Sequence, residues 1–171
     1  MVTTCSPTNF DFCKSLGAEA AFDYQDEACG EQIHEYTRGQ LRLVWDTVGS
    51  EPGVKICMEA LTSDPGAKYG TILFNKIPRE DVSYTSSFLV TFLGEAFDKF
   101  GVHMEARPAD FEFAKRFAGI VEGLLAQGKI TPHRVKVCKG GLQGILDEGI
   151  GLMNNDKISG CKLVSRMADT L

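Results

Sequence analysis

The chain has 171 residues, of which 43% are hydrophobic and 24% are charged, and its formal net charge is -5. These values are those of an ordinary globular protein of single-domain size. The acidic balance argues against a nucleic-acid partner, because binding to a phosphate backbone needs a basic face. No segment approaches the roughly 18 consecutive apolar residues of a membrane span, and the amino end lacks the pattern of a signal peptide. We therefore expect a cytoplasmic protein without membrane association.

Six cysteines are scattered along the chain with no Cys-x-x-Cys pair. In a chain without a secretory signal, this spacing favours reduced and mostly buried thiols over disulfides. The three histidines form no HxxxH or HExxH pair with one another. The sequence therefore gives no support for a zinc site, and no metal is expected.

The first eighty residues alternate between strand and helix patterns. Ser6-Pro7 offers a helix cap followed by proline at the first helical position, and Gly17 signals the end of that helix. Ser50 can cap a later helix, in which the residues on one face are Val54, Cys57, Met58 and Leu61. In chain order we expect strands at 2–5, 20–24, 41–46 and 69–74, and helices at 7–16, 31–37 and 50–61.

Strands that alternate with helices of this length predict right-handed βαβ units, a parallel sheet and helices on both of its faces. The predicted fold class is therefore α/β, as an incomplete doubly wound (Rossmann) sheet. The sheet is expected to be incomplete, because a strand that should be internal to the sheet stands at residue 2.

The alternation stops after residue 78. Residues 79–107 form an insert, in which the apolar run 88–93 fits either a buried strand or a helix of a lid. A long amphipathic helix is expected from Pro108 to about Gln127. Its buried stripe should consist of Phe113, Phe117, Ile120, Val121, Leu124 and Leu125.

A strand at 134–137, a helix at 142–153 and a strand at 162–164 make up a C-terminal strand-helix-strand tail. Glycines 140, 141 and 144 stand between its first strand and its helix, but they lack the first glycine of a dinucleotide-binding GxGxxG loop. We therefore expect a turn there. The two expected domains are 1–130, the sheet with its insert, and 131–171, the tail.

In a dinucleotide-binding fold, the end of the second strand faces the adenosine ribose, where an Asp or Glu selects NAD and would repel a 2′-phosphate. The corresponding stretch here, Thr4 to Asn9, contains no acid. The Ser6 hydroxyl, the Asn9 amide and backbone N–H groups at a helix start suit a 2′-phosphate. The alternative is that Ser6-Pro7 only caps a helix.

Several motifs resemble one known family. The run from Ser6 to Glu19, followed by Phe22-Asp23-Tyr24, is similar to the second βαβ segment of the medium-chain dehydrogenase/reductase superfamily. Trp45-Asp46-Thr47-Val48-Gly49 resembles its strand-end Asp-x-x-Gly, and residues 157–164 resemble its closing strand. Ser-Pro-x-Asn at 6–9 and the C-terminal tail are most similar to the trans-acting enoyl reductases of polyketide synthases. The resemblance covers nearly the whole chain.

The resemblance implies NADPH as the cofactor. The implied site is made of Ser6, Pro7, Thr8 and Asn9 at the 2′-phosphate, Tyr24 beside the adenine, Ile72 and Leu73 at the nicotinamide through their backbone, and Ile158 and Ser159 closing over the same cofactor. The acyl pocket would be lined by Thr91, Phe92, Leu93, Gly94 and Glu95. Two alternatives stay open: Tyr24 can be a core aromatic at a strand end, and the stretch 91–95 can be core packing of the insert.

The implied reaction is hydride transfer from NADPH to the β-carbon of an α,β-unsaturated acyl thioester, carried by a carrier domain of a polyketide synthase. The catalytic residues are unknown, since Tyr24 and Tyr84 are candidates for the proton donor by residue type alone. The family also has an amino-terminal catalytic domain, on which the tail would dock, and a glycine-rich turn after its first strand. Neither is found in this sequence, so we expect an N-terminally truncated chain that is inactive alone.

Other functions remain open at this stage. The chain can be a non-catalytic remnant that binds a nucleotide or a partner, or a zinc-independent dehydrogenase of the quinone-reductase type. A Rossmann-like methyltransferase ranks lower, because its chemistry also needs the absent glycine-rich first loop.

Overall fold

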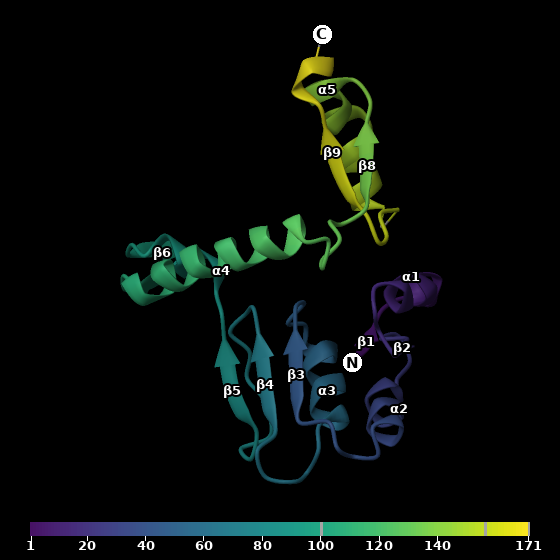
Figure 1. Ribbon diagram of the computed structural model, residues 1–171, viewed down its shortest axis with the longest axis vertical. Helices are drawn as coiled ribbons and strands as arrows, with labels where there is room; N and C mark the ends of the chain where they lie inside the picture. Colours follow the sequence, from purple (N-terminus) through teal and green to yellow (C-terminus); the bar gives the residue numbers. More distant parts are fainter. Residues whose placement is uncertain (100, 156, 171) are drawn as a thin grey trace. The chain divides into compact units, whose positions relative to one another are not determined.

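The computed structural model describes residues 1–99, 101–155 and 157–170. The chain divides into two compact units, unit 1 from Met1 to Glu122 and unit 2 from Gly123 to Leu171. The division falls inside helix α4 (Pro108–Ala126). The domain boundary expected after residue 130 stays a prediction. Each unit has its own strand pairs and is described by itself (Figure 1).

Unit 1 opens with two parallel strands, β1 (Val2–Thr4) and β2 (Ala20–Phe22). The crossover between them runs through a short 3-10 helix, η1 (Pro7–Asn9), and then α1 (Phe10–Ser15). Gly17 has a φ of 104°, a left-handed conformation that favours glycine, and it turns the chain at the predicted helix end.

The second sheet of unit 1 is parallel and has the order β3-β4-β5. Its strands are β3 (Leu43–Asp46), β4 (Lys68–Thr71) and β5 (Ser83–Ser86), and their arrowheads in Figure 1 point to the same edge. The predicted helices are present as α2 (Cys29–Tyr36) before β3 and α3 (Glu51–Ala60) after it. Ser50 caps α3 as predicted, because its hydroxyl accepts a hydrogen bond from the Gly53 N–H at 3.2 Å.

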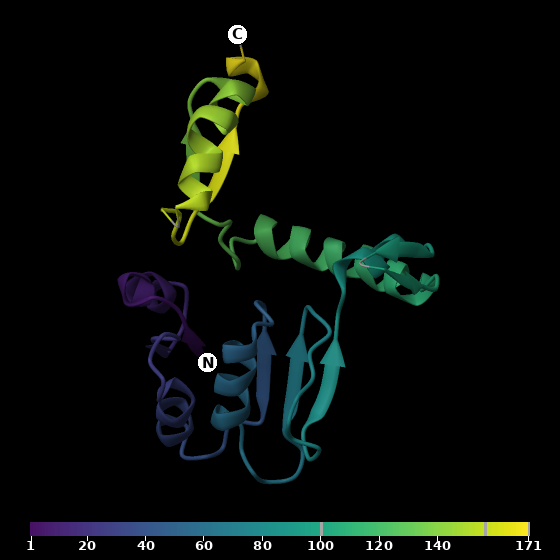
Figure 2. The same ribbon diagram turned by 180° about the vertical axis from the view of Figure 1, so that it is seen from behind.

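Two clusters of buried side chains hold unit 1 together. The first lies between α3 and the second sheet and consists of Val54, Met58, Leu61, Ala67, Tyr69 and Val82. The second lies between α2 and α3, which are side by side in Figure 2, and consists of Cys29, Ile33 and Ala60. Val2 and Phe22 pack against this second cluster, so it connects the first strand pair to the helices of the second sheet.

Each sheet of unit 1 ends in strands that pair on one side only. Among the described residues, β1 is hydrogen-bonded only to β2, and β3 only to β4. Leu43 and Trp45, on the same face of β3, are 64% and 53% exposed. Open edges with apolar side chains promote association with other chains.

The insert differs from the prediction in three strands, β5, β6 (Phe97–Lys99) and β7 (Val102–Met104). The sequence of β5 is Ser-Tyr-Thr-Ser, which has no alternation of apolar and polar residues, and β6 and β7 form a short antiparallel hairpin. The apolar run 88–93 is not a strand, because it forms the 3-10 helix η2 (Leu89–Leu93).

Helix α4 has nearly the predicted bounds, but the predicted burial of its apolar stripe is wrong. No described residue of α4 is buried, and the side chains of Phe113, Phe117 and Ile120 are 45%, 49% and 52% exposed. Periodicity identifies an apolar face but not what covers it. None of the described helices is long and apolar enough to span a bilayer.

Unit 2 has the predicted strand-helix-strand order. β8 (Val135–Cys138) and β9 (Lys162–Ser165) are parallel, and between them run α5 (Gly141–Gly144), the π-helical segment η3 (Ile145–Gly149) and α6 (Ile150–Asn154). A 3-10 turn, η4 (Met167–Asp169), follows β9. Gly140 and Gly141 have φ values of 80° and 57°, so the glycine-rich stretch is a tight turn, as predicted.

Candidate functional site

The residues predicted to hold a 2′-phosphate stand at the carboxyl end of β1. Ser6 precedes η1, yet its side chain makes no capping hydrogen bond to that helix. Its hydroxyl instead donates to the phenol oxygen of Tyr24 at 3.5 Å, and Tyr24 follows β2. The structure thus brings two of the predicted residues together, while Ser6 also stands at the N-cap position of η1.

The surroundings of this pair suit an anionic group. Pro7 and Thr8 are exposed, Ser6 and Asn9 are half-buried, and the Tyr24 side chain is 47% exposed, so Tyr24 is not a core aromatic. The nearest acid in sequence, Asp23, accepts a hydrogen bond from the Gln25 N–H at 2.9 Å within its own turn. Hydroxyl and amide groups therefore gather here without a carboxylate among residues 4–9, which is the chemistry that a phosphate needs.

Ile72 and Leu73 lie directly beyond β4, which ends at Thr71 and is shorter than predicted. The Ile72 N–H donates to the Asp46 carbonyl at 3.3 Å, and the Leu73 N–H donates to the Thr71 hydroxyl at 3.3 Å. The Leu73 carbonyl accepts from the Tyr84 hydroxyl at 3.1 Å. Both backbone groups of Leu73 are therefore already bonded within the protein, whereas in the described part of the chain the Ile72 carbonyl has no such partner.

Each group of predicted residues follows the carboxyl end of a parallel strand in unit 1. In parallel strands the carboxyl ends meet at one edge, where dinucleotides bind in open α/β sheets. Figures 1 and 2 both show α1, which follows Ser6 to Asn9, toward the end of unit 1 to which the arrowheads of β3, β4 and β5 point. Ile72 follows the arrowhead of β4.

The tyrosines considered as proton donors have other partners. The Tyr84 hydroxyl donates to the Leu73 carbonyl and accepts from the Asn75 N–H, each at 3.1 Å. The Tyr24 phenol lies with Ser6 beyond β2. Neither geometry directs a proton toward a substrate, so no catalytic residue is assigned.

The stretch predicted to line an acyl pocket divides into packed and exposed residues. Thr91 is 2% exposed, and its hydroxyl lies 2.8 Å from the Phe88 carbonyl oxygen and 2.6 Å from Asp110 Oδ2. Gly94 ends η2 with a φ of 74°. Leu93 is 65% exposed and Glu95 is also exposed. Thr91 and Gly94 therefore have structural roles, and the exposed side chains are the ones accessible to a ligand.

Ile158 and Ser159 belong to unit 2. Ile158 lines a hollow of about 350 Å³ together with Met153, Cys161, Lys162 and Leu163. Ser159 stands directly before Gly160, whose φ is 59°.

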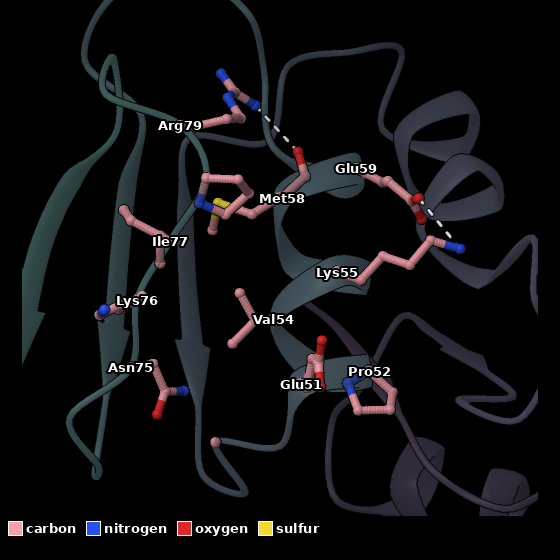
Figure 3. Close-up of a pocket in the computed structure, with 12 residues that line it drawn as sticks. Glu51, Pro52, Val54, Lys55, Met58, Glu59, Asn75, Lys76, Ile77 and Arg79 are labelled. Atoms are coloured by element: carbon pink, nitrogen blue, oxygen red, sulfur yellow. Dashed lines mark hydrogen bonds and ion pairs between the residues drawn. The ribbon is translucent and has the colours of Figure 1, made fainter.

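A larger cavity of about 1130 Å³ runs along α3 (Figure 3). Its wall is the extended segment from Asn75 to Arg79, which connects β4 to β5 where other crossovers of unit 1 have a helix. Arg79 closes one end by donating to the carbonyl oxygens of Met58, Leu61 and Thr62 at 3.0, 3.3 and 2.8 Å. No predicted site residue lines this cavity, and no sequence motif predicts it.

The side chains that could bind a metal or react as thiolates are the histidines, cysteines and acids. Within 1–99, 101–155 and 157–170, no three His, Cys, Asp or Glu side chains gather in a group that could hold a metal ion. All six cysteines are free thiols. Burial raises the pKa of the Cys57 thiol to about 12 and that of the Cys29 thiol to about 11, so both keep their protons at neutral pH.

Comparison with known proteins decides the family. No protein-family model matches the chain. The chain is 36% identical over 170 residues to trans-enoyl reductase resD of Aspergillus sclerotiorum and 39% identical over 167 residues to trans-enoyl reductase ACTTS2 of Alternaria alternata. The chain is a member of the trans-enoyl reductase family. These matches cover 97% and 96% of the chain but 47% of each relative, so it spans about half the length of these trans-enoyl reductases.

A third relative is a two-function protein. Over 148 residues the chain is 43% identical to the dual trans-enoyl reductase/FAD-dependent monooxygenase tazHJ of Aspergillus terreus, a match that covers 86% of the chain and 21% of that protein. The likeness to trans-enoyl reductases therefore extends to a relative in which the enoyl reductase is joined to another enzyme.

Solved structures show the fold of the chain. The CurF ER cyclopropanase from the curacin A pathway matches with a TM-score of 0.67 at 16% identity, over 95% of this chain and 45% of that one. CurA from Vibrio vulnificus in complex with NADPH matches with a TM-score of 0.60 at 18% identity, over 96% and 48%. The predicted Rossmann-type α/β fold is confirmed.

Proposed function

We propose that the chain supplies the NADPH-binding part of an enoyl reductase that acts in polyketide biosynthesis. The observation that carries the proposal is the 32–43% identity to trans-enoyl reductases over 86–98% of the chain. The reaction is the reduction of an α,β-unsaturated acyl thioester presented by a carrier domain of a polyketide synthase. NADPH, when bound, supplies the hydride for the β-carbon; the protein binds and orients both reactants.

The chain's own residues fit NADPH at the adenosine end. Ser6, Thr8 and Asn9 offer donors for a 2′-phosphate, and the residues from 4 to 9 include no carboxylate that would repel it. Tyr24, held at 3.5 Å from the Ser6 hydroxyl and 47% exposed, offers an aromatic face for the adenine. Pro7 holds the backbone of this turn at a fixed φ.

At the other end, the segment after β4 meets the nicotinamide. The Leu73 backbone is bonded within the protein, so the Ile72 carbonyl is the group on this segment that accepts from the carboxamide. Leu73 lies 39% exposed beside it and offers an apolar contact. On the acyl side, Leu93 and Glu95 are the exposed residues of the stretch 91–95, and we assign the acyl chain to that surface.

Replacing Ser6 with aspartate tests the cofactor assignment. The new carboxylate would stand next to the 2′-phosphate, and two like charges about 4 Å apart repel by several kcal/mol near a protein surface. We expect the dissociation constant for NADPH to rise at least tenfold, while that for NADH, which lacks the phosphate, changes less than about twofold. Both constants are measured by NMR titration of the 171-residue chain into the millimolar range.

Ser15→Asp is the matched control, because it adds the same charge at the far end of α1 on an exposed serine. It should leave the NADPH constant unchanged. A wild-type chain that binds NADH as tightly as NADPH would rule out the 2′-phosphate assignment.

We also propose that a polypeptide of these 171 residues has no enoyl reductase activity alone. The sequence has no GxGxxG loop for the pyrophosphate, and two or three charge-assisted hydrogen bonds are together worth roughly 3–9 kcal/mol. The expected result is no NADPH oxidation above background when purified chain is mixed with an enoyl thioester. Measurable turnover by the purified chain contradicts this proposal, and a full-length trans-enoyl reductase serves as the positive control for the assay.

A further inference from the structure

The turn after β3 is fixed by one buried carboxylate. Asp46 is 7% exposed, and its Oδ1 accepts hydrogen bonds from the Val48 N–H at 2.9 Å and the Gly49 N–H at 2.8 Å. Gly49 has a φ of 67°, and a Cβ there would stand 2.9 Å from Leu73 Cδ1. The turn after β3 therefore packs closely against the segment after β4.

Tyr69 joins this turn to the segment after β4. Its side chain is 1% exposed, and its hydroxyl donates to Asp46 Oδ2 at 2.9 Å. The same hydroxyl accepts from the side-chain amide of Asn75 at 3.0 Å. Burial raises the pKa of Tyr69 to about 12, so the phenol keeps the proton that it donates to Asp46.

A second tyrosine holds the backbone of the same segment. The Tyr84 hydroxyl donates to the Leu73 carbonyl and accepts from the Asn75 N–H, each at 3.1 Å, and its ring stacks on that of Tyr69 at 6.0 Å between centroids. Leu73 and Asn75 are thus held from inside, while Ile72 and Phe74 are 38% and 61% exposed. The anchoring acts on the backbone, because the Leu73 side chain is itself 39% exposed.

We propose that Tyr69 is a positioning residue for the nicotinamide half of the cofactor. Its hydroxyl fixes the segment from Ile72 to Asn75 relative to the turn after β3, so that the Ile72 carbonyl is presented in one orientation. The inference rests on the proposed function, because it takes NADPH as the ligand. The adenosine half meets β1 and β2 instead, and among the described residues no hydrogen bond connects Tyr69 to those strands.

Tyr69→Phe separates a positioning role from a loss of overall structure. It removes the hydroxyl and leaves Asp46 Oδ2 and the Asn75 amide without this partner. We expect the dissociation constant for NADPH to rise about tenfold, because the two hydrogen bonds of this hydroxyl no longer hold the segment after β4. The constant for 2′,5′-ADP, which contains the adenosine phosphates but no nicotinamide, should stay within about twofold. Both are measured by NMR titration of the full chain.

Tyr36→Phe is the matched control. It also removes one phenol hydroxyl, which lies 3.3 Å from Glu19 Oε1 at an exposed position, and it should change neither constant. If Tyr69→Phe weakens NADPH and 2′,5′-ADP equally, or weakens neither, the positioning role is overturned.

Amide hydrogen exchange without any cofactor separates this inference from the proposed function. In Tyr69→Phe, the amides of Leu73 and Asn75 should exchange at least tenfold faster, while the amide of Cys5, bonded to the Phe22 carbonyl at 3.0 Å, should not change. If wild type binds neither NADPH nor 2′,5′-ADP, the proposed function fails, and exchange alone decides whether Tyr69 orders this segment. Unchanged exchange at Leu73 and Asn75 overturns the inference whatever the chain binds.

Discussion

Gly144→Ala is expected to unfold unit 2. A Cβ at residue 144 would stand 1.7 Å from the Lys139 carbonyl oxygen and 2.9 Å from its carbonyl carbon, and both are backbone atoms that cannot rotate away. The helix that begins at Gly141 would have to move away from the end of β8, which separates it from the strands that it covers. Overpacking typically costs about 1–3 kcal/mol, and we expect a cost at or above the upper end because backbone atoms must move.

Amide hydrogen exchange of β8 and β9 is the measurement for this variant, because the single tryptophan, Trp45, lies in unit 1 and does not report on unit 2. The amides of Val137 and Val164 should lose their protection. Gly149→Ala is the matched control: it lies in η3, which directly follows Gly144, and is also buried, but its Cβ would meet nothing closer than 3.8 Å. The control should be neutral or stabilising by up to about 1 kcal/mol, because alanine favours helices.

The glycines of this turn show where sequence reasoning is reliable and where it stops. The spacing of glycines 140, 141 and 144 already argued against a phosphate loop, because the first glycine of the motif is missing. The positive φ values of Gly140 and Gly141 and the close approach at Gly144 give the reason that glycine is needed. The close approach between Lys139 and Gly144 follows from the left-handed conformations of the two glycines between them, which the glycine spacing alone does not specify.

Elements with a local signal were predicted well. The cap at Ser50, the helix end at Gly17 and the helix from Pro108 follow from hydrogen bonds and φ preferences within a few residues. β5 was missed, because its four polar residues become a strand only by pairing with β4. The buried stripe predicted for α4 was wrong for a related reason: burial depends on a covering surface.

In the candidate site, too, some features could be predicted from the sequence and others depend on tertiary contacts. The absence of acids from Thr4 to Asn9 and the order of the motifs were visible in the sequence and led to the family. The approach of Ser6 to Tyr24 was implied by that family and not by spacing. The hydrogen bonds among Asp46, Tyr69 and Asn75 had no sequence signal. They join three segments that come together only when β3 and β4 pair in parallel.

Asp46→Ala is expected to be the most destabilising substitution in the second sheet of unit 1. It removes the acceptor for the Val48 and Gly49 N–H groups and for the Tyr69 hydroxyl. Hydrogen bonds to a charged group are worth about 1.5–3 kcal/mol each, and their losses are not additive when they share one side chain. We expect the free energy of unfolding to fall by about 3–5 kcal/mol. Trp45 stands directly before Asp46, so its fluorescence in urea follows this sheet.

Two further variants serve as controls for Asp46→Ala. Asp46→Asn keeps an acceptor for the Val48 and Gly49 N–H groups but offers Tyr69 an amide in place of a carboxylate oxygen, so the loss should be below about 2 kcal/mol. Asp64→Ala removes an exposed carboxylate whose ion pair with Arg42 is 3.8 Å long, and should cost less than about 1 kcal/mol. If Asp46→Ala costs no more than Asp64→Ala, then the carboxylate does not hold the turn after β3. Tyr69 would then have no fixed partner from which to position the segment after β4.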